Sequence, residues 1–195
     1  MVCQQFSTPA GSTVVSAALT AQLEQLMSAL AKDTGILLDQ ATQLWKEGKT
    51  AEAENALSAI QQDTTRWSAL QPSTRADILT LRGKLALESA DKESAEKFAK
   101  DASTLGQFDS VRCLLSLIAL VKGDTAQSLD HLKDCTTEAA DRIRISIMLQ
   151  EGNSADALKI ISKIESASTS LADTLRLKAL ALLMQRNVKE ALAAI

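Results

Sequence analysis

The fold is decided by residues 110–164, which read SVRCLLSLIALVKGDTAQSLDHLKDCTTEAADRIRISIMLQEGNSADALKIISKI. Two helix–turn–helix units follow one another in this stretch. In each unit an apolar helix (Val111 to Val121, then Ile143 to Leu149) runs into a glycine turn, and an amphipathic helix follows. Small or apolar residues lie 5, 9 and 12 positions after each glycine, namely Ser128, Leu132 and Cys135 after Gly123, and Ala157, Ile161 and Ile164 after Gly152.

The same spacing surrounds three more predicted turns, at Gly48, Ala90 and Arg186. Successive turns are 42, 33, 29 and 34 residues apart by subtraction of the five turn positions, and a period near 34 is typical of helical repeats. Small or apolar residues lie seven positions before each turn and at the same offsets after it. They are Ala41, Ala53, Leu57 and Ile60; Gly83, Ala95, Ala99 and Ala102; and Ala179, Ala191 and Ile195.

Helix packing explains this spacing. Small residues allow two helices to approach closely, and a glycine at the turn adopts a positive φ without steric cost. The central hairpins have Ser116 and Ile145 seven residues before their turns. Because Ile145 is large, we expect the fourth hairpin to be splayed or shifted relative to its neighbours. No single hairpin buries its own apolar face, so the units must stack.

The chain divides into three predicted parts. Residues 1–12 contain Pro9 and Gly11 among small polar residues, and we expect them to form a flexible lead-in. Residues 13–34 carry apolar side chains at spacings of three and four, which predicts an N-terminal helix that ends at Gly35. Residues 35–195 hold the repeats.

Two further boundaries follow from the pattern. Residues 62–73, which include Trp67 and Pro72, are predicted to be the longest break between helices, and Thr74 is predicted to begin the next helix. The chain stops inside its last predicted helix at Ile195. Because repeat arrays ordinarily need a polar capping helix, this favours an array that is truncated at its C-terminal end.

Composition indicates an all-α protein. The 195 residues are 46% apolar, with two prolines and no tyrosine. A formal net charge of −3 and a pI near 5.3 argue against a nucleic-acid partner, which would need a basic face. The longest apolar run, about nine residues from Cys113 to Val121, is too short to cross a bilayer. Three cysteines without CxxC spacing, and no basic N-terminal region, predict a reduced, cytoplasmic protein.

The sequence shows no catalytic motif. It has no G-x-S-x-G sequence, no P-loop and no glycine-rich phosphate cradle. The lone His131 has Cys135 at i+4 as its candidate co-ligand, and two side chains are too few for zinc. Acidic pairs such as Glu52 and Glu54 fit a solvated helix face better than a hydrolase site. The sequence therefore predicts a protein that is not an enzyme and has no cofactor or metal.

Residues 36–195 resemble tetratricopeptide repeats. The resemblance rests on the spacing around the turns, because leucines such as Leu37, Leu79 and Leu175 replace the large aromatic residues of the family. The family's proline after the second helix is also missing, and related helical-hairpin solenoids share the spacing. The resemblance implies an all-α, right-handed superhelix of antiparallel helical hairpins that serves as a scaffold or adaptor for other proteins.

The resemblance also implies a partner-binding site. In tetratricopeptide proteins the first helix of each hairpin lines a concave groove. Here the C-terminal half of that groove would be apolar and would receive a helical or extended segment of a partner protein, with cations at its edges. The implied groove residues are Trp45, Lys46, Lys84, Leu117, Leu120, Val121, Arg142, Leu149, Arg176, Leu180 and Leu183. The alternative is that tight curvature closes the groove and its leucines are core.

Two other functional classes remain open. The chain could be a sensor or regulatory repeat domain of a larger multidomain enzyme, such as a signalling ATPase. An RNA-binding repeat protein would need a basic stripe on the inward face, where cations such as Lys46 and Lys84 are few and are mixed with Asp77 and Glu88. We therefore expect a protein partner, no nucleic acid and no membrane segment.

Overall fold

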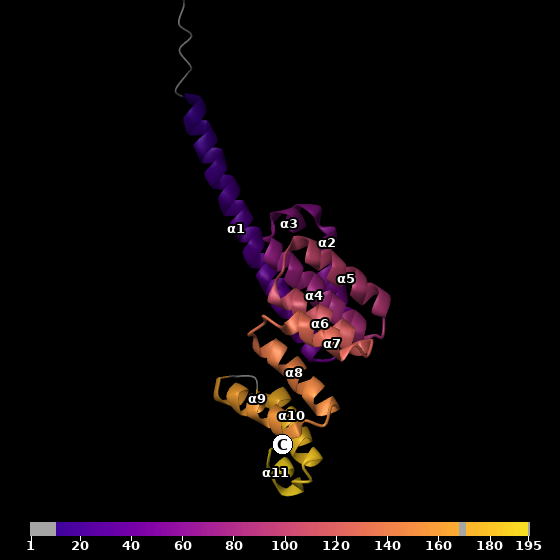
Figure 1. Ribbon diagram of the computed structural model, residues 1–195. Coiled ribbons are helices and arrows are strands. Elements are labelled where there is room, and N and C mark those ends of the chain that lie inside the picture. Colours follow the sequence, from indigo (N-terminus) through magenta and orange to yellow (C-terminus); the bar gives the residue numbers. More distant parts are fainter. Residues whose placement is uncertain (1–10, 168–170, 195) are drawn as a thin grey trace, which may run out of the picture. The chain divides into compact units, whose positions relative to one another are not determined.

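The computed structural model describes residues 11–167 and 171–194, and every regular element in these ranges is a helix (Figure 1). The chain forms two compact units, one ending at Ile78 and one beginning at Leu79. The helices are α1 (Gly11–Lys46), α2 (Thr50–Gln62), α3 (Thr64–Ala69), α4 (Pro72–Glu88), α5 (Lys92–Leu105), α6 (Asp109–Val121), α7 (Thr125–Leu132), α8 (Glu138–Gln150), α9 (Ser154–Ala167), α10 (Leu171–Met184) and α11 (Val188–Ala193).

The first unit is built on the long helix α1. Helices α2 and α3 contact the C-terminal part of α1 and each other, and buried Ala41 and Leu57 lie in this packed region. The N-terminal part of α1 extends beyond them (Figure 1), and Leu23 and Leu26 are exposed there.

Gly35 does not end a helix, so the predicted boundary at residue 34 is wrong. Helix α1 is continuous from Gly11 to Lys46, and Gly35 lies in its interior. A glycine in a helix interior costs only about 1 kcal/mol relative to alanine. Buried Thr34 and Ala41, on either side of Gly35, show that the helix is packed here, and this packing outweighs that cost. Of the predicted lead-in, residues 1–10 lie outside the described residues.

The predicted break at 62–73 contains a short helix, α3, which is a second correction. Asp63 caps it by accepting a hydrogen bond from the Arg66 backbone N–H at 3.0 Å. Trp67 therefore lies on a helix, half-buried, and not in a loop. Helix α4 begins at Pro72, before the predicted Thr74, because proline is well suited to the first turn of a helix.

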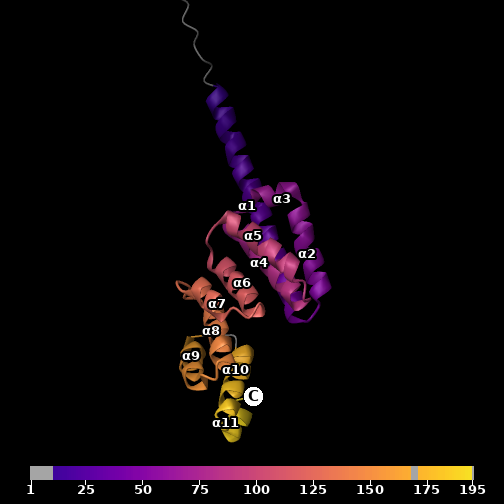
Figure 2. The ribbon, with the colours of Figure 1, turned by 45° about the vertical axis from the view of Figure 1, so that its right-hand side comes forward.

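The second unit is a stack of helical hairpins. Each helix from α5 to α11 contacts the next one along the chain, and both views show these neighbours side by side (Figure 2). In addition α6 contacts α8, and α8 contacts α10, so these three helices form a layer that we call the first-helix layer. Each inner hairpin thus buries its apolar residues against its neighbours, as stacking requires.

The five predicted turns have the same geometry, which confirms the repeat register. The residue at each turn has a positive φ: 78° at Gly48, 60° at Ala90, 83° at both Gly123 and Gly152, and 61° at Arg186. In every case the next backbone N–H donates to the carbonyl five residues earlier, at 2.8–2.9 Å. This bond is the mark of a Schellman C-cap.

The small or apolar residues 5, 9 and 12 positions after these turns are buried, as predicted. Those after the turns at Gly48, Ala90, Gly123 and Gly152 are all buried, as is Ala191 after the last turn; Ile195 lies outside the described residues. Ile145 is fully buried in a cluster with Ala157 and Ile161, so the stack accommodates its bulk. The splaying expected for this hairpin stays a prediction.

Candidate partner-binding surface

The predicted groove residues divide between the two units. Trp45 and Lys46 end helix α1 in the first unit; Trp45 is half-buried and Lys46 is exposed. The lysine lies in the last turn, where a cation interacts favourably with the helix dipole. The other predicted groove residues belong to the second unit, so the two sets are described separately.

Leu149 is core, which corrects its assignment to an open groove. Its exposed fraction is 6%, and it lies in the cluster that contains Ile145, Ile161 and Ala181. The neighbouring helices α9 and α10 cover it. The alternative that the inward leucines are core therefore holds for this residue.

Leu117 and Leu120 lie between core and surface. Both are half-buried and pack against a cluster that includes Cys113, Ile143 and Ile147. Val121, at the end of α6, is exposed. This part of the predicted face therefore offers a partner one exposed apolar side chain and the edges of two leucines.

The apolar surface that remains open lies on α10. Leu180 and Leu183 are 48% and 49% exposed, and Met184 beside them is also exposed. Spacings of three and four residues place the three side chains on one face of the helix. We call these three residues the α10 apolar face. Sequence analysis placed all three residues on the inward face and named the two leucines as groove residues.

The predicted edge cations differ in their surroundings. Arg142 is tied to its own helix by an ion pair with Glu138, at 2.6 Å between the guanidinium nitrogen and the carboxylate oxygen. Lys84 is half-buried on α4. Arg176 is exposed one helical turn before Leu180, so it flanks the α10 apolar face.

Arg144 is a structural residue that sequence analysis missed. Its guanidinium donates to the carbonyls of Leu132 at 2.7 Å and Cys135 at 2.6 Å, and pairs with Asp141 at 2.6 Å. Arg144 on α8 thereby holds the end of α7 and the segment that connects α7 to α8. Arg142 and Arg144 are two residues apart on α8, and no spacing rule distinguishes their roles.

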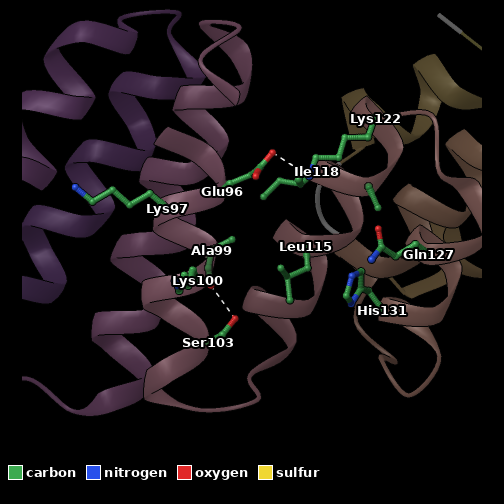
Figure 3. Close-up of a pocket in the computed structure, with 11 residues that line it drawn as sticks. Glu96, Lys97, Ala99, Lys100, Ser103, Leu115, Ile118, Lys122, Gln127 and His131 are labelled. Atoms are coloured by element: carbon green, nitrogen blue, oxygen red, sulfur yellow. Dashed lines mark hydrogen bonds and ion pairs between the residues drawn. The ribbon is translucent and has the colours of Figure 1, made fainter. Parts of the chain in front are cut away.

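A hollow of about 480 Å³ lies between α5, α6 and α7, and sequence analysis also missed it (Figure 3). Ala99 on α5 and Leu115, Ile118 and Ala119 on α6 provide its apolar walls. Lys100, Lys122, Gln127 and His131 stand among the polar residues at its rim.

The two cysteines in the described part of the chain are packed as small apolar residues, as predicted. Cys113 and Cys135 are buried free thiols in the core between α6, α7 and α8. Burial raises the pKa of both thiols above the usual value, which keeps them protonated and poorly nucleophilic. Within residues 11–167 and 171–194 no three His, Cys, Asp or Glu side chains converge as metal ligands. No helix in this described part is both long and apolar enough to cross a membrane.

Comparison with known proteins bears on the fold. No protein-family profile matches the chain, and no curated protein matches it. Among solved structures, the chain is similar to the crystal structure of a tetratricopeptide repeat protein from Parabacteroides merdae. The TM-score is 0.54 at 17% sequence identity, over 94% of this chain and 87% of that one. The fold is tetratricopeptide-repeat-like. A tetratricopeptide-like chain without the family's aromatic residues therefore keeps the fold through its turns and its small residues.

Proposed function

We propose that this tetratricopeptide-like chain is a non-catalytic scaffold or adaptor that binds a helical or extended segment of a partner protein. The α10 apolar face is the centre of the proposed site, and Leu117, Leu120 and Val121 on α6 are proposed as a second part of it. Folds of this kind generally mediate protein–protein interactions. Binding would proceed by surface complementarity, without a reaction.

The observation that carries this proposal is the exposure of Leu180, Leu183 and Met184. Single exposed leucines are ordinary, but contiguous apolar side chains on one face mark interaction sites. Their spacing suits the face of an amphipathic partner helix, whose own anchors recur every three to four residues. Arg176 at the edge would favour a carboxylate on the partner segment.

Residence in the cytoplasm is part of the same proposal. Cys113 and Cys135 are free thiols in the core, which fits a reducing compartment.

Photocrosslinking tests the proposal and identifies the partner. The photoreactive residue p-benzoylphenylalanine would replace Leu183 in the protein expressed in its native source. The matched control would carry it at Leu129, which is also exposed but lies on the second helix α7. We expect a specific protein adduct from position 183 and not from position 129.

The affinity for the captured segment is then measured with purified protein. Since burial of a leucine contributes roughly 1.5–3 kcal/mol, Leu180→Ser with Leu183→Ser should weaken binding by about 10- to 100-fold. Because both side chains are half-exposed, the free energy of unfolding should change by less than about 1 kcal/mol. Equal crosslinking from both positions, or unchanged affinity in the double variant, would contradict the proposal.

A further inference from the structure

The hollow between α5, α6 and α7 lies at a departure from the repeat pattern. Nine residues after the turn, the second helix has Leu57, Leu132 or Ile161 in three repeats but Ala99 in α5. All three of these larger side chains are buried. The alanine lacks three side-chain carbons that its equivalents have, and it lines the hollow.

The hollow and the proposed partner-binding face lie on opposite sides of α6. Leu115, Ile118 and Ala119 line the hollow, whereas Leu117 and Leu120 face the first-helix layer. At 100° per residue these two sets are nearly half a turn apart around the helix. A ligand in the hollow would therefore be held separately from a partner on the α10 apolar face.

The walls and the rim of the hollow differ in chemistry. Its apolar walls end in a rim with Lys100, Lys122 and Glu96, two positive charges and one negative, which is a net formal charge of +1 in a chain whose net charge is −3. Lys122, which directly follows α6, forms an ion pair with Glu96 on α5 at 2.9 Å across one end of the hollow. His131 and Leu115 both line the hollow, while Lys97 extends away from it (Figure 3). Lys100, His131 and the Gln127 amide are the donors left at the rim.

We propose that this hollow docks a second partner-protein segment, in which one apolar side chain is flanked by Asp or Glu. The apolar side chain fills the space opposite Ala99, and the acidic side chains meet Lys100, His131 and the Gln127 amide. Because the rim has a net positive charge, the flanking side chains of the partner segment are acidic and not basic. This inference does not depend on the proposed function, because it uses another face.

A peptide fits these observations better than a small anion does. Lys100 is exposed, and Lys122 and Glu96 are about half-exposed, so water screens their interactions and each charge contributes little by itself. The affinity for a ligand must therefore come from contact with the apolar walls. The rim charges then select the segments whose apolar side chain has acidic neighbours. A peptide supplies both, and it can continue along the exposed surface of α5.

The test uses two capped synthetic peptides and methyl-labelled full-length protein. One peptide has a leucine between two pairs of Glu, and the other has the same leucine between two pairs of Lys. The methyl resonances of Leu115 and Ile118 report occupancy of the hollow. We expect the acidic peptide to shift them in a saturable way and to bind at least about tenfold more tightly than the basic one.

Two variants make the test specific. Ala99→Leu restores the larger side chain of the other repeats and should weaken acidic-peptide binding at least about tenfold. The other methyl resonances should keep the dispersion of the folded protein. Lys100→Glu leaves the walls intact and should reverse the preference between the peptides, which keeps the test decisive if Ala99→Leu does not fold. The variant with Leu180→Ser and Leu183→Ser should bind the acidic peptide normally.

Other results would overturn the inference. These are absence of methyl shifts with either peptide, equal binding of both peptides, and no effect of Ala99→Leu in a folded protein. Octanoate is the small-molecule control. Saturable shifts with octanoate but not with the acidic peptide would mean that the hollow takes a small amphiphile and not a protein segment.

Discussion

Ser116 and Ser128 join the two helices of the third hairpin through a buried hydrogen bond, with 2.7 Å between their Oγ atoms. These residues lie seven positions before and five positions after Gly123. In this hairpin the two small-residue positions therefore also form a hydrogen bond between the helices. Ser116→Ala should destabilise the protein by about 1–2 kcal/mol, because the Ser128 hydroxyl would remain buried without its partner. Chemical denaturation measures this change. Replacing both serines by alanine should cost clearly less than the sum of the single changes, whereas strict additivity would show that the bond contributes nothing.

At the scale of the element, α1 provides the sharpest test. Gly35 has no other atom within 4 Å of a Cβ built on it, and its φ is helical. Gly35→Ala should therefore stabilise the protein by about 0.5–1 kcal/mol in thermal or chemical denaturation. Gly48→Ala is the matched control, because φ is 78° at Gly48 and alanine should destabilise there by about 1 kcal/mol. A destabilised Gly35→Ala variant would indicate a turn at Gly35, as the sequence pattern predicts.

Prediction from sequence succeeded or failed according to the range of the interactions involved. The turns at Ala90 and Arg186 were predictable because a Schellman turn and the residues buried beside it lie within about 12 positions. Gly35 was misread because its helix is held by packing against residues further along the chain.

The site was harder to predict than the fold. Leu149 and Leu183 each lie three residues before a turn, yet α9 and α10 cover Leu149 whereas Leu183 is open. Which face neighbouring helices cover depends on how hairpins stack, and spacing within one hairpin does not contain that information. For the hollow a signal did exist, since Ala99 stands where other repeats have leucine or isoleucine.

In the molecule as a whole, five turns share one register. The stacking of the hairpins and both proposed binding surfaces follow from these turns. Gly48, Gly123 and Gly152 would tolerate a positive φ in many folds. Ala90 and Arg186 are therefore the informative positions, since a left-handed backbone costs them roughly 1–2 kcal/mol.

Backbone chemical shifts and three-bond couplings measured by NMR report φ at these two residues. We predict positive φ values at both residues, near the 60° and 61° of the structure. Each residue lies between the end of one helix and the start of the next. Negative φ at Ala90 and Arg186 would place those hairpins out of register and contradict the account.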